Sequence, residues 1–277
     1  MDPHSTKSAS LIALFKNVWM NRNLIVQMTK REIVGRYRGS AMGLLWSFIN
    51  PVLMLAVYTF VFSVVFKARW GASSVAASKS DFAVILFVGL IVHTLFAETL
   101  TRAPSLIIAN VNYVKKVVFP LEILSITSLA SVVFHSLVSL IVLLSAFFIF
   151  NGFIHWTAIF IPVVLFPLIL VTLGLSWFLS SLGVFLRDVG QTIAILMTIL
   201  MFLSPIFYPI SSLPPNFQSV IMLNPLTFII EQARSVLIWG KLPDFVGLAI
   251  YSAISLLICW ACYAWFQKTR KGFADVL

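Results

Sequence analysis

Six runs of residues with little or no charge set the strongest limit on how this chain folds. Each is long enough, at about 20 residues or more, to cross the hydrocarbon core of a bilayer as a helix. Leu, Ile, Phe and Val dominate them, without the two-residue alternation of a membrane barrel strand. The whole sequence is 60% hydrophobic and only 10% charged, with a mean hydropathy of +1.02. It predicts an all-α integral membrane protein with six transmembrane helices, near residues 41–66, 82–101, 123–150, 157–186, 189–210 and 245–266.

The Lys and Arg residues are divided unevenly between the two sides of these spans. Of 19 such residues, 14 lie on the side of the N-terminus and 5 lie on the other. Because cytoplasmic loops carry the excess of positive charge, we expect a multi-pass protein of the inner (plasma) membrane with both termini in the cytoplasm. The N-terminal segment lacks the pattern of a secretory signal peptide. The net charge of +10 flanks apolar segments instead of covering a soluble face, which argues against nucleic acid as a partner.

Arg187 and Asp188 stand side by side between two apolar runs. A charge inside hydrocarbon is costly, so such a pair marks either a functional intramembrane site or a turn that meets water. The predicted topology places the pair at a tight cytoplasmic turn between the fourth and fifth spans. We therefore expect it to face water or a partner at the inner surface.

Three segments do not span. Within the cytoplasmic N-terminal region, residues 1–40, apolar side chains recur at helical spacing among cations, which predicts an amphipathic interface helix; an electrostatic anchor to anionic membrane lipids is the alternative. Residues 108–122 fit a short helix across the inner surface or a solvated loop. Residues 211–240 fit two short re-entrant helices at the outer side, since Glu231 and Arg234 are too polar to face lipid. All residues from 41 to 277 form a single predicted transmembrane domain.

The outer segment also carries helix boundary signals. Asn224 followed by Pro225 is a good helix start, and Gly240 is a good stop. The helix between them must turn its polar groups toward protein or a water-filled cavity. Such elements commonly line or close a pathway.

Several kinds of chemistry are missing from the sequence. It contains no Gly-rich phosphate loop, so ATP-driven work would need a second polypeptide. Coupling ions usually require a cluster of intramembrane carboxylates, but Glu98, five residues after His93, is the one acid well inside a span, and it is either structural or pathway-lining. Neither the paired acids of an interfacial transferase nor a metal-binding set is visible, and Cys259 and Cys262 fit ordinary packing.

Aromatic residues form the most suggestive pattern. The sequence contains 25 Phe, and Tyr58, Phe62 and Phe66 recur every four residues on the first span. Core packing explains such a stripe, and so does a conduit, because aromatic faces bind sugar rings without fixed hydrogen bonds. A second group surrounds the proline-rich end of the fifth span and consists of Phe202, Phe207 and Tyr208.

Five ordered motifs together carry a family resemblance. They read "KREIVGRYRGSAMGLLWSFINPVLMLAVYTFVF", "NVNYVKKVVFPLEIL", "FLRDVGQ" with "SPIFYP", "NPLTFIIEQAR" and "KGFADVL". Between them they cover roughly residues 20–277, and they resemble the membrane permease of polysaccharide-exporting type-two ABC transporters, which move O-antigen, capsule and teichoic-acid polymers.

The resemblance implies a homodimer bound to two copies of a separate ATPase subunit, which holds ATP and Mg. No catalytic residue, cofactor or metal belongs to this chain itself. The amphipathic helix and a coupling helix would contact the ATPase, the latter through Asn112, Tyr113, Val114, Lys115, Lys116, Phe119 and Pro120. Arg187 and Asp188 would lie near the cytoplasmic entrance or a second ATPase contact. The outer gate would include Asn224, Pro225, Glu231 and Arg234, and the channel lining Tyr58, Phe62, Phe66, Phe202, Phe207 and Tyr208.

The implied function is processive export of a lipid-linked polysaccharide, with O-antigen as the first choice. Its lipid head group would be guided at the entrance by Arg31, Arg36, Tyr37 and Arg38. Two alternatives stay open. A type-two ABC permease for a lipid or small drug would share the fold. An ATP-independent channel or secondary carrier would instead need no ATPase, and such carriers usually show inverted repeats or ionisable groups at the midplane.

Overall fold

The computed structural model describes residues 11–67, 70, 79–115 and 119–277, and every regular element within them is a helix. Five helical segments there are long and apolar enough to cross a membrane, and a sixth is added if one bent helix pair is counted as a span. The prediction of an all-α integral membrane protein is therefore confirmed. The principal helices of the bundle are α3 (Trp46–Tyr58), α4 (Lys79–Arg102), α7 (Glu122–Asn151), α8 (Ile161–Phe185), α9 (Val189–Leu203) and α12 (Phe245–Thr269).

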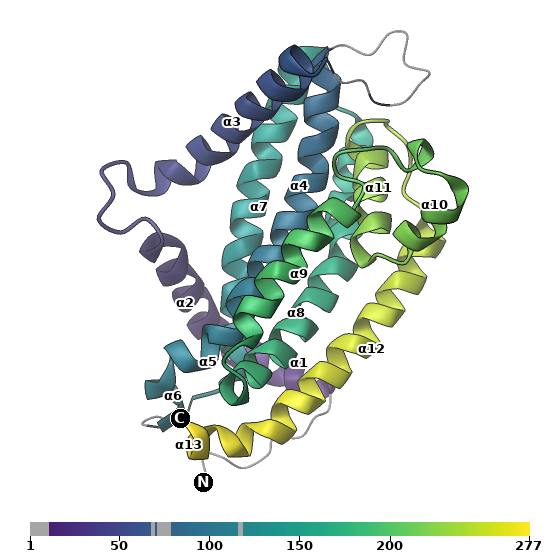
Figure 1. The fold of residues 1–277 in the computed structure, drawn as a ribbon. Helices are drawn as coiled ribbons and strands as arrows, with labels where there is room; N and C mark the ends of the chain where they lie inside the picture. Colours follow the sequence, from purple (N-terminus) through teal and green to yellow (C-terminus); the bar gives the residue numbers. More distant parts are fainter. Residues whose placement is uncertain (1–10, 68–69, 71–78, 116–118) are drawn as a thin grey trace.

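Helix α4 is the centre of the bundle. Of its most apolar window 83% is buried, against 11% for the first span. It packs on α3, α7, α8 and α9, and α8 packs along the length of α12 (Figure 1). Gly174 allows α8 to approach α12 closely, because a Cβ at this position would lie only 2.6 Å from the Cα of Cys259 on α12.

The first span is irregular. A 3-10 turn, Gly43–Leu45, leads into α3, and the span ends in a π-helix, η2 (Thr59–Val65). Figure 1 shows α3 leaning away from α7 toward its N-terminal end. A cavity lies between α3 and the α4–α7 pair.

The N-terminal segment forms two helices where the sequence predicts one: α1 (Leu11–Met20) and α2 (Arg22–Gly35). Asn21 separates them, and its side-chain amide donates to the carbonyl oxygen of Asn17 at 2.8 Å. In α1 the large apolar residues Phe15 and Trp19 are exposed, as expected of a membrane-surface helix.

The fifth apolar helix is shorter than predicted. The sequence suggests a span over residues 189–210, yet α9 ends at Leu203. Ser204 is extended because it precedes Pro205, which disfavours helical backbone before it and lacks an N–H. The chain then forms η5 (Ile210–Ser212), α10 (Pro215–Met222) and α11 (Pro225–Leu237), and α10 and α11 meet at 95°.

Segments from both ends of the described chain meet at one end of the bundle, called here the terminal end. It contains η3 (Ala103–Ser105), α5 (Leu106–Ala109), α6 (Val111–Lys115), η6 (Arg270–Gly272) and α13 (Phe273–Val276). The opposite, distal end contains α10 and the start of α12 (Figure 1). The α1 and α13 helices both lie at the terminal end.

Candidate functional site

Four charged side chains form an ion-pair ladder between α2 and α4. Arg36 donates to Oε1 of Glu98 at 2.6 Å, and Arg102 donates to the same oxygen at 2.5 Å. Arg102 also donates to Oε1 of Glu32 at 3.3 Å. Two cations therefore balance two anions, and the ladder ties the C-terminal half of α2 to the bundle.

The pKa of Glu32 reflects the burial of its carboxyl group. Burial raises the pKa of the Glu32 carboxyl above its ordinary value of 4.5, and the positive charge of Arg102 opposes that rise. Burial likewise raises the pKa of the Tyr37 hydroxyl, while the Arg36 guanidinium lowers it. The segment with these two residues thus lies against the helices and not out in solvent.

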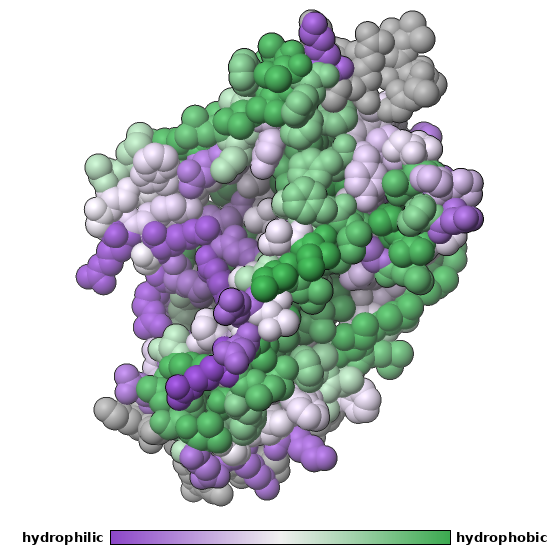
Figure 2. All heavy atoms as spheres, in the orientation of Figure 1, coloured by the Kyte–Doolittle hydropathy of each residue, from purple (hydrophilic) through white to green (hydrophobic). Residues whose placement is uncertain are grey.

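A polar cavity of about 470 Å³ lies beside this ladder, bounded by the end of α2 and by α3, α4 and α7. Figure 2 shows hydrophilic residues gathered in the hollow framed by α2 and α3, next to the hydrophobic surface over α9. It is lined by Arg36, Tyr37, Ser47, Asn50, Pro51, Met54, Tyr58, Phe87, Leu90, Ile91, Thr94, Glu98, His135, Ser136 and Ser139.

Many polar groups of this cavity have no partner in the described chain. Buried Nε2 of His135 makes no hydrogen bond. The Asn50 and Thr94 side chains are exposed within apolar spans, and neither makes a hydrogen bond to the described residues. The Tyr37 and Tyr58 hydroxyls likewise make no hydrogen bond to the described residues. Polar groups within apolar helices need partners, so these groups can hydrogen-bond water or a hydroxyl-rich ligand beside the apolar part of the lining.

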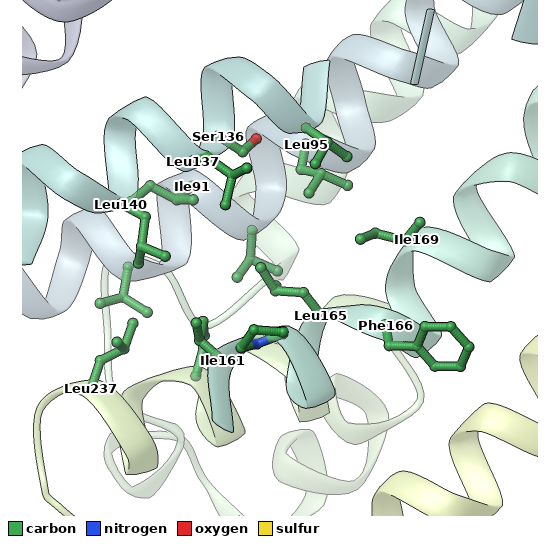
Figure 3. Close-up of a pocket in the computed structure, with 15 residues that line it drawn as sticks. Ile91, Leu95, Ser136, Leu137, Leu140, Ile161, Leu165, Phe166, Ile169 and Leu237 are labelled. Carbon is green, nitrogen blue, oxygen red and sulfur yellow. The ribbon is translucent and has the colours of Figure 1, made fainter. Parts of the chain in front are cut away.

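A second cavity, of about 200 Å³, lies on the other side of the α4–α7 pair, between α4, α7, α8 and α11. Figure 3 shows its lining, in which Ser136 is the one labelled polar side chain among Leu, Ile and Phe residues. Ile91 and Ser136 line both cavities. The second cavity suits hydrocarbon only, so the α4–α7 seam separates a polar compartment from an apolar one.

Both predicted aromatic groups meet in a single cluster. Phe62 lies 6.4 Å from Tyr58 and 5.8 Å from Phe66, between ring centroids, and stacks on Phe207 at 6.1 Å. Phe207 in turn stacks on Phe202 at 5.8 Å. The Tyr208 hydroxyl instead donates to the Phe202 carbonyl at 3.1 Å. Tyr58 also lines the polar cavity, so this one side chain belongs to both the cavity wall and the aromatic cluster.

Arg234 of α11 is fully buried at the distal side of this cluster. It donates to Oε1 of Glu231 at 2.8 Å and to the carbonyl oxygens of Ile85 and Ile206 at 3.2 and 3.1 Å. Its guanidinium carbon also lies 4.3 Å from the centroid of the Trp70 ring. One side chain therefore joins α11, α4 and the chain after α9.

The start of α11 is as the sequence predicts. The helix begins at Pro225, and Oδ1 of Asn224 accepts from the Leu226 N–H at 2.9 Å as an N-cap. Asn224 also donates to Oγ of Ser204 at 2.9 Å, which ties the cap to the end of α9. The helix ends at Leu237, and Gly240 follows with φ of +63°.

The predicted coupling segment contains the short helix α6. Tyr113 stacks on Phe119 with centroids 4.5 Å apart, and its hydroxyl accepts from Arg31 at 3.4 Å. Val114 and Phe119 are buried, whereas Asn112 is exposed. Pro120 lies just before α7, and Lys116 lies outside the described residues. The segment therefore contacts α2, the other segment expected to meet an ATPase.

Arg187 and Asp188 form the expected turn between α8 and α9. Both are exposed, and no ion pair joins either to the described chain. The Asp188 carbonyl accepts from the Thr192 N–H at 3.1 Å. Arg187 borders a cavity of about 630 Å³ together with Val276 and Leu277 of the tail.

Sequence reasoning missed a buried hub on Glu122. Its Oε1 accepts from Asn17 at 2.6 Å and its Oε2 accepts from Arg270 at 3.0 Å, while its carbonyl accepts from the Trp177 indole at 2.9 Å. The hub joins α1, α7, α8 and η6. One signal in the sequence pointed to it, an acid at the start of a span. Among the described residues no group of three or more His, Cys, Asp or Glu gathers to hold a metal ion.

Residues 23–238 match the family described as ABC-2 type transporter. The chain is 27% identical to an O-antigen export system permease protein, RfbA, of Myxococcus xanthus, over 96% of this chain and 99% of the relative. It is 26% identical to the RfbA protein of Klebsiella pneumoniae, over 92% and 95%. A polysialic acid transport protein, KpsM, of Escherichia coli is 24% identical, over 87% and 91%. The chain thus belongs to the ABC-2 type transporter membrane family.

Proposed function

We propose that this chain is the permease of an ATP-driven exporter that moves a lipid-linked polysaccharide, O-antigen first among the candidates, from the cytoplasm across the inner membrane. The observation that carries this proposal is that Tyr58 both lines the polar cavity and packs in the aromatic cluster, so the two lie next to each other. A glycan needs hydrogen-bonding groups and aromatic faces along its path, and here the two kinds of group lie next to each other. The names of the relatives support the same substrate class.

Energy for export comes from a partner. Two copies of a separate ATPase bind ATP and Mg and contact α6, and the packing of Tyr113 with Phe119 and Arg31 links α6 to α7 and α2. Motion of α6 therefore passes to the ion-pair ladder and to α4. The permease works as a homodimer with both termini in the cytoplasm, and the exposed apolar residues of α3 face the second copy or lipid.

A crosslink tests the coupling assignment. A single cysteine is introduced at Asn112, with Cys259 and Cys262 replaced by Ala, in membranes of cells that export the glycan. The matched control cysteine stands at Phe217, an exposed residue of α10 at the distal end. We expect the Asn112 position alone to capture a soluble ATPase with a phosphate-binding loop.

Two results would overturn the proposal. Restored export without capture of an ATPase from Asn112 would point to an ATP-independent channel or carrier. Failure of the wild-type chain to restore surface glycan in a deletion strain would remove polysaccharide as the substrate and leave a lipid or small drug.

A further inference from the structure

We propose that the polar cavity binds an uncharged sugar unit of the exported chain, and that the phosphate of the lipid carrier is bound outside it. This inference rests on the proposed function and names which part of the substrate the cavity recognises. It revises the sequence-based expectation that Arg36 guides a charged head group.

The charges in the cavity lining are balanced, which argues against a phosphate site there. Arg36 is the one Lys or Arg side chain among the lining residues, and Glu98 is the one carboxylate. They form an ion pair at 2.6 Å, and Glu98 is shared with Arg102, which itself reaches Glu32. The positive charge that a phosphate would need is thus already matched. A dianionic group would bring uncompensated negative charge beside Glu98, and like charges so close together repel each other.

Unpaired hydrogen-bonding groups carry the second step. Tyr37, Asn50, Tyr58 and Thr94 present hydroxyl and amide groups without partners in the described chain, and Nε2 of His135 is buried without one. These groups both donate and accept, and a sugar hydroxyl can use both capacities, whereas the acceptor-only oxygens of phosphate would use the donors alone. The cavity of about 470 Å³ falls within the range of small-ligand sites, roughly 300–1,000 Å³.

Aromatic rings complete the match. Tyr37 packs edge-on against His135 with centroids 5.7 Å apart, and Tyr58 begins the aromatic cluster that leads distally. A sugar bound at the cavity can move onto ring faces without a charged step in between. Arg38, by contrast, is exposed and lies outside the lining, with no ion pair in the described chain. Of the three arginines predicted for the entrance, Arg38 is the one whose side chain has no partner in the described chain, which leaves it able to meet phosphate.

Photo-crosslinking tests this division. Benzoylphenylalanine is placed singly at Thr94, at Asn50, at Arg38 and at the control position Ile141, an exposed apolar residue of α7, in cells that make the glycan. Adducts are treated with aqueous hydrofluoric acid, which cleaves phosphate esters. We expect glycan adducts at Thr94 and Asn50 that survive the acid, adducts at Arg38 that lose their glycan, and no glycan at Ile141. Adducts also form on substrate that stalls, so a variant that blocks export remains informative.

Other outcomes count against the inference. Acid removal of the glycan from the Thr94 and Asn50 adducts would place phosphate in the cavity. No adduct at either position would show that substrate bypasses the cavity. In both cases surface glycan restored by the wild-type chain would leave the proposed function standing.

A substitution gives a second measure. Asn50→Leu removes one hydrogen-bonding group at constant size, and we expect export to fall about tenfold. Val57→Leu, on an exposed face of the same helix, is the matched control and should export normally. Unchanged export by Asn50→Leu would contradict a sugar site that uses this amide.

Discussion

Arg234 shows how a charge is tolerated in the interior of this protein. Its guanidinium is fully buried, and Nε, Nη1 and Nη2 each donate to a different acceptor while Trp70 covers one face. A buried cation without such partners would be prohibitively costly. The acceptors come from three separate segments, so the charge serves to position α11 against α4 and the end of α9.

Replacement of Arg234 by Met should destabilise the protein by about 3 kcal/mol, because it leaves two carbonyls and Glu231 without their donor. Arg234→Lys should recover part of the loss, since an ammonium reaches fewer of these acceptors. Melting curves in detergent measure both, with exposed Arg38→Met as the control. An Arg234→Met protein that melts with the wild type would refute the positioning role.

Glu32 gives a pH dependence with a defined sign. Its pKa is raised above 4.5 in the folded protein, mainly by burial, so the folded state holds the Glu32 proton more tightly than the unfolded chain. The contribution to stability is full below pH 4.5 and is lost as the pH rises through the raised pKa. Glu32→Gln lacks this contribution. The melting temperature of the wild type minus that of Glu32→Gln should therefore fall with rising pH across this window; a flat or rising difference would contradict the assignment.

The residues of the candidate site differ in how far the sequence reveals them. Tyr58, Phe62, Phe207 and the Asn224 cap follow from spacing and local chemistry, because such patterns lie within one helix or turn. Glu122 could not be paired with Arg270 in the same way, because 148 residues separate them and only tertiary packing brings them together. Predicted spans likewise mark each helix but not which faces enclose the polar cavity.

At the scale of elements, η2 determines how the first span meets the fifth. The π-helix turns the end of the span so that Phe62 contacts rings from four other positions: Tyr58, Phe66, Phe82 and Phe207. Single π turns within helices are frequent at functional sites. The stacking joins two elements that no sequence motif connects.

Phe62→Ala should separate η2 from the chain after α9, with a loss of roughly 2 kcal/mol from the ring pairs alone. Export should fall with it. Phe60, two residues earlier, is 59% exposed, so Phe60→Ala is the matched control. Surface glycan and melting temperature are measured for both, and equal behaviour would exclude a special role for the stack.

The contact between α8 and η3 depends on a glycine. A Cβ at Gly183 would lie 2.7 Å from the Cα of Pro104, closer than side-chain carbons approach backbone. Gly183→Ala should therefore push η3 and the coupling segment away, at a cost of about 1–3 kcal/mol. Gly35→Ala, where nothing lies within 4 Å, should be neutral or slightly stabilising. Lower crosslinking from Asn112 in the first variant alone checks the displacement; equal crosslinking in both would argue against it.

For the molecule as a whole, the expected topology predicts on which side of the membrane each loop and each terminus lies. Green fluorescent protein fused after Leu277 should fluoresce, because that end is expected in the cytoplasm, and alkaline phosphatase there should be inactive. Fusions after Leu242, in the distal loop before α12, should behave in the opposite way. An active phosphatase at Leu277 would invert the protein and place the ion-pair ladder on the outer side.

The position of α4 at the centre of the bundle has a consequence for biosynthesis. The most buried span is the second to leave the ribosome, before α7, α8, α9 and α11 exist to cover it. The His93 ring cannot form its 3.1 Å hydrogen bond with the Met197 carbonyl until about a hundred further residues have been synthesised. Glu98 can form its ion pairs early, since Arg36 is already synthesised and Arg102 follows within about one helical turn. The ladder is thus also one of the early tertiary contacts available to the new chain, and it neutralises the acid on α4 before the rest of the bundle assembles around it.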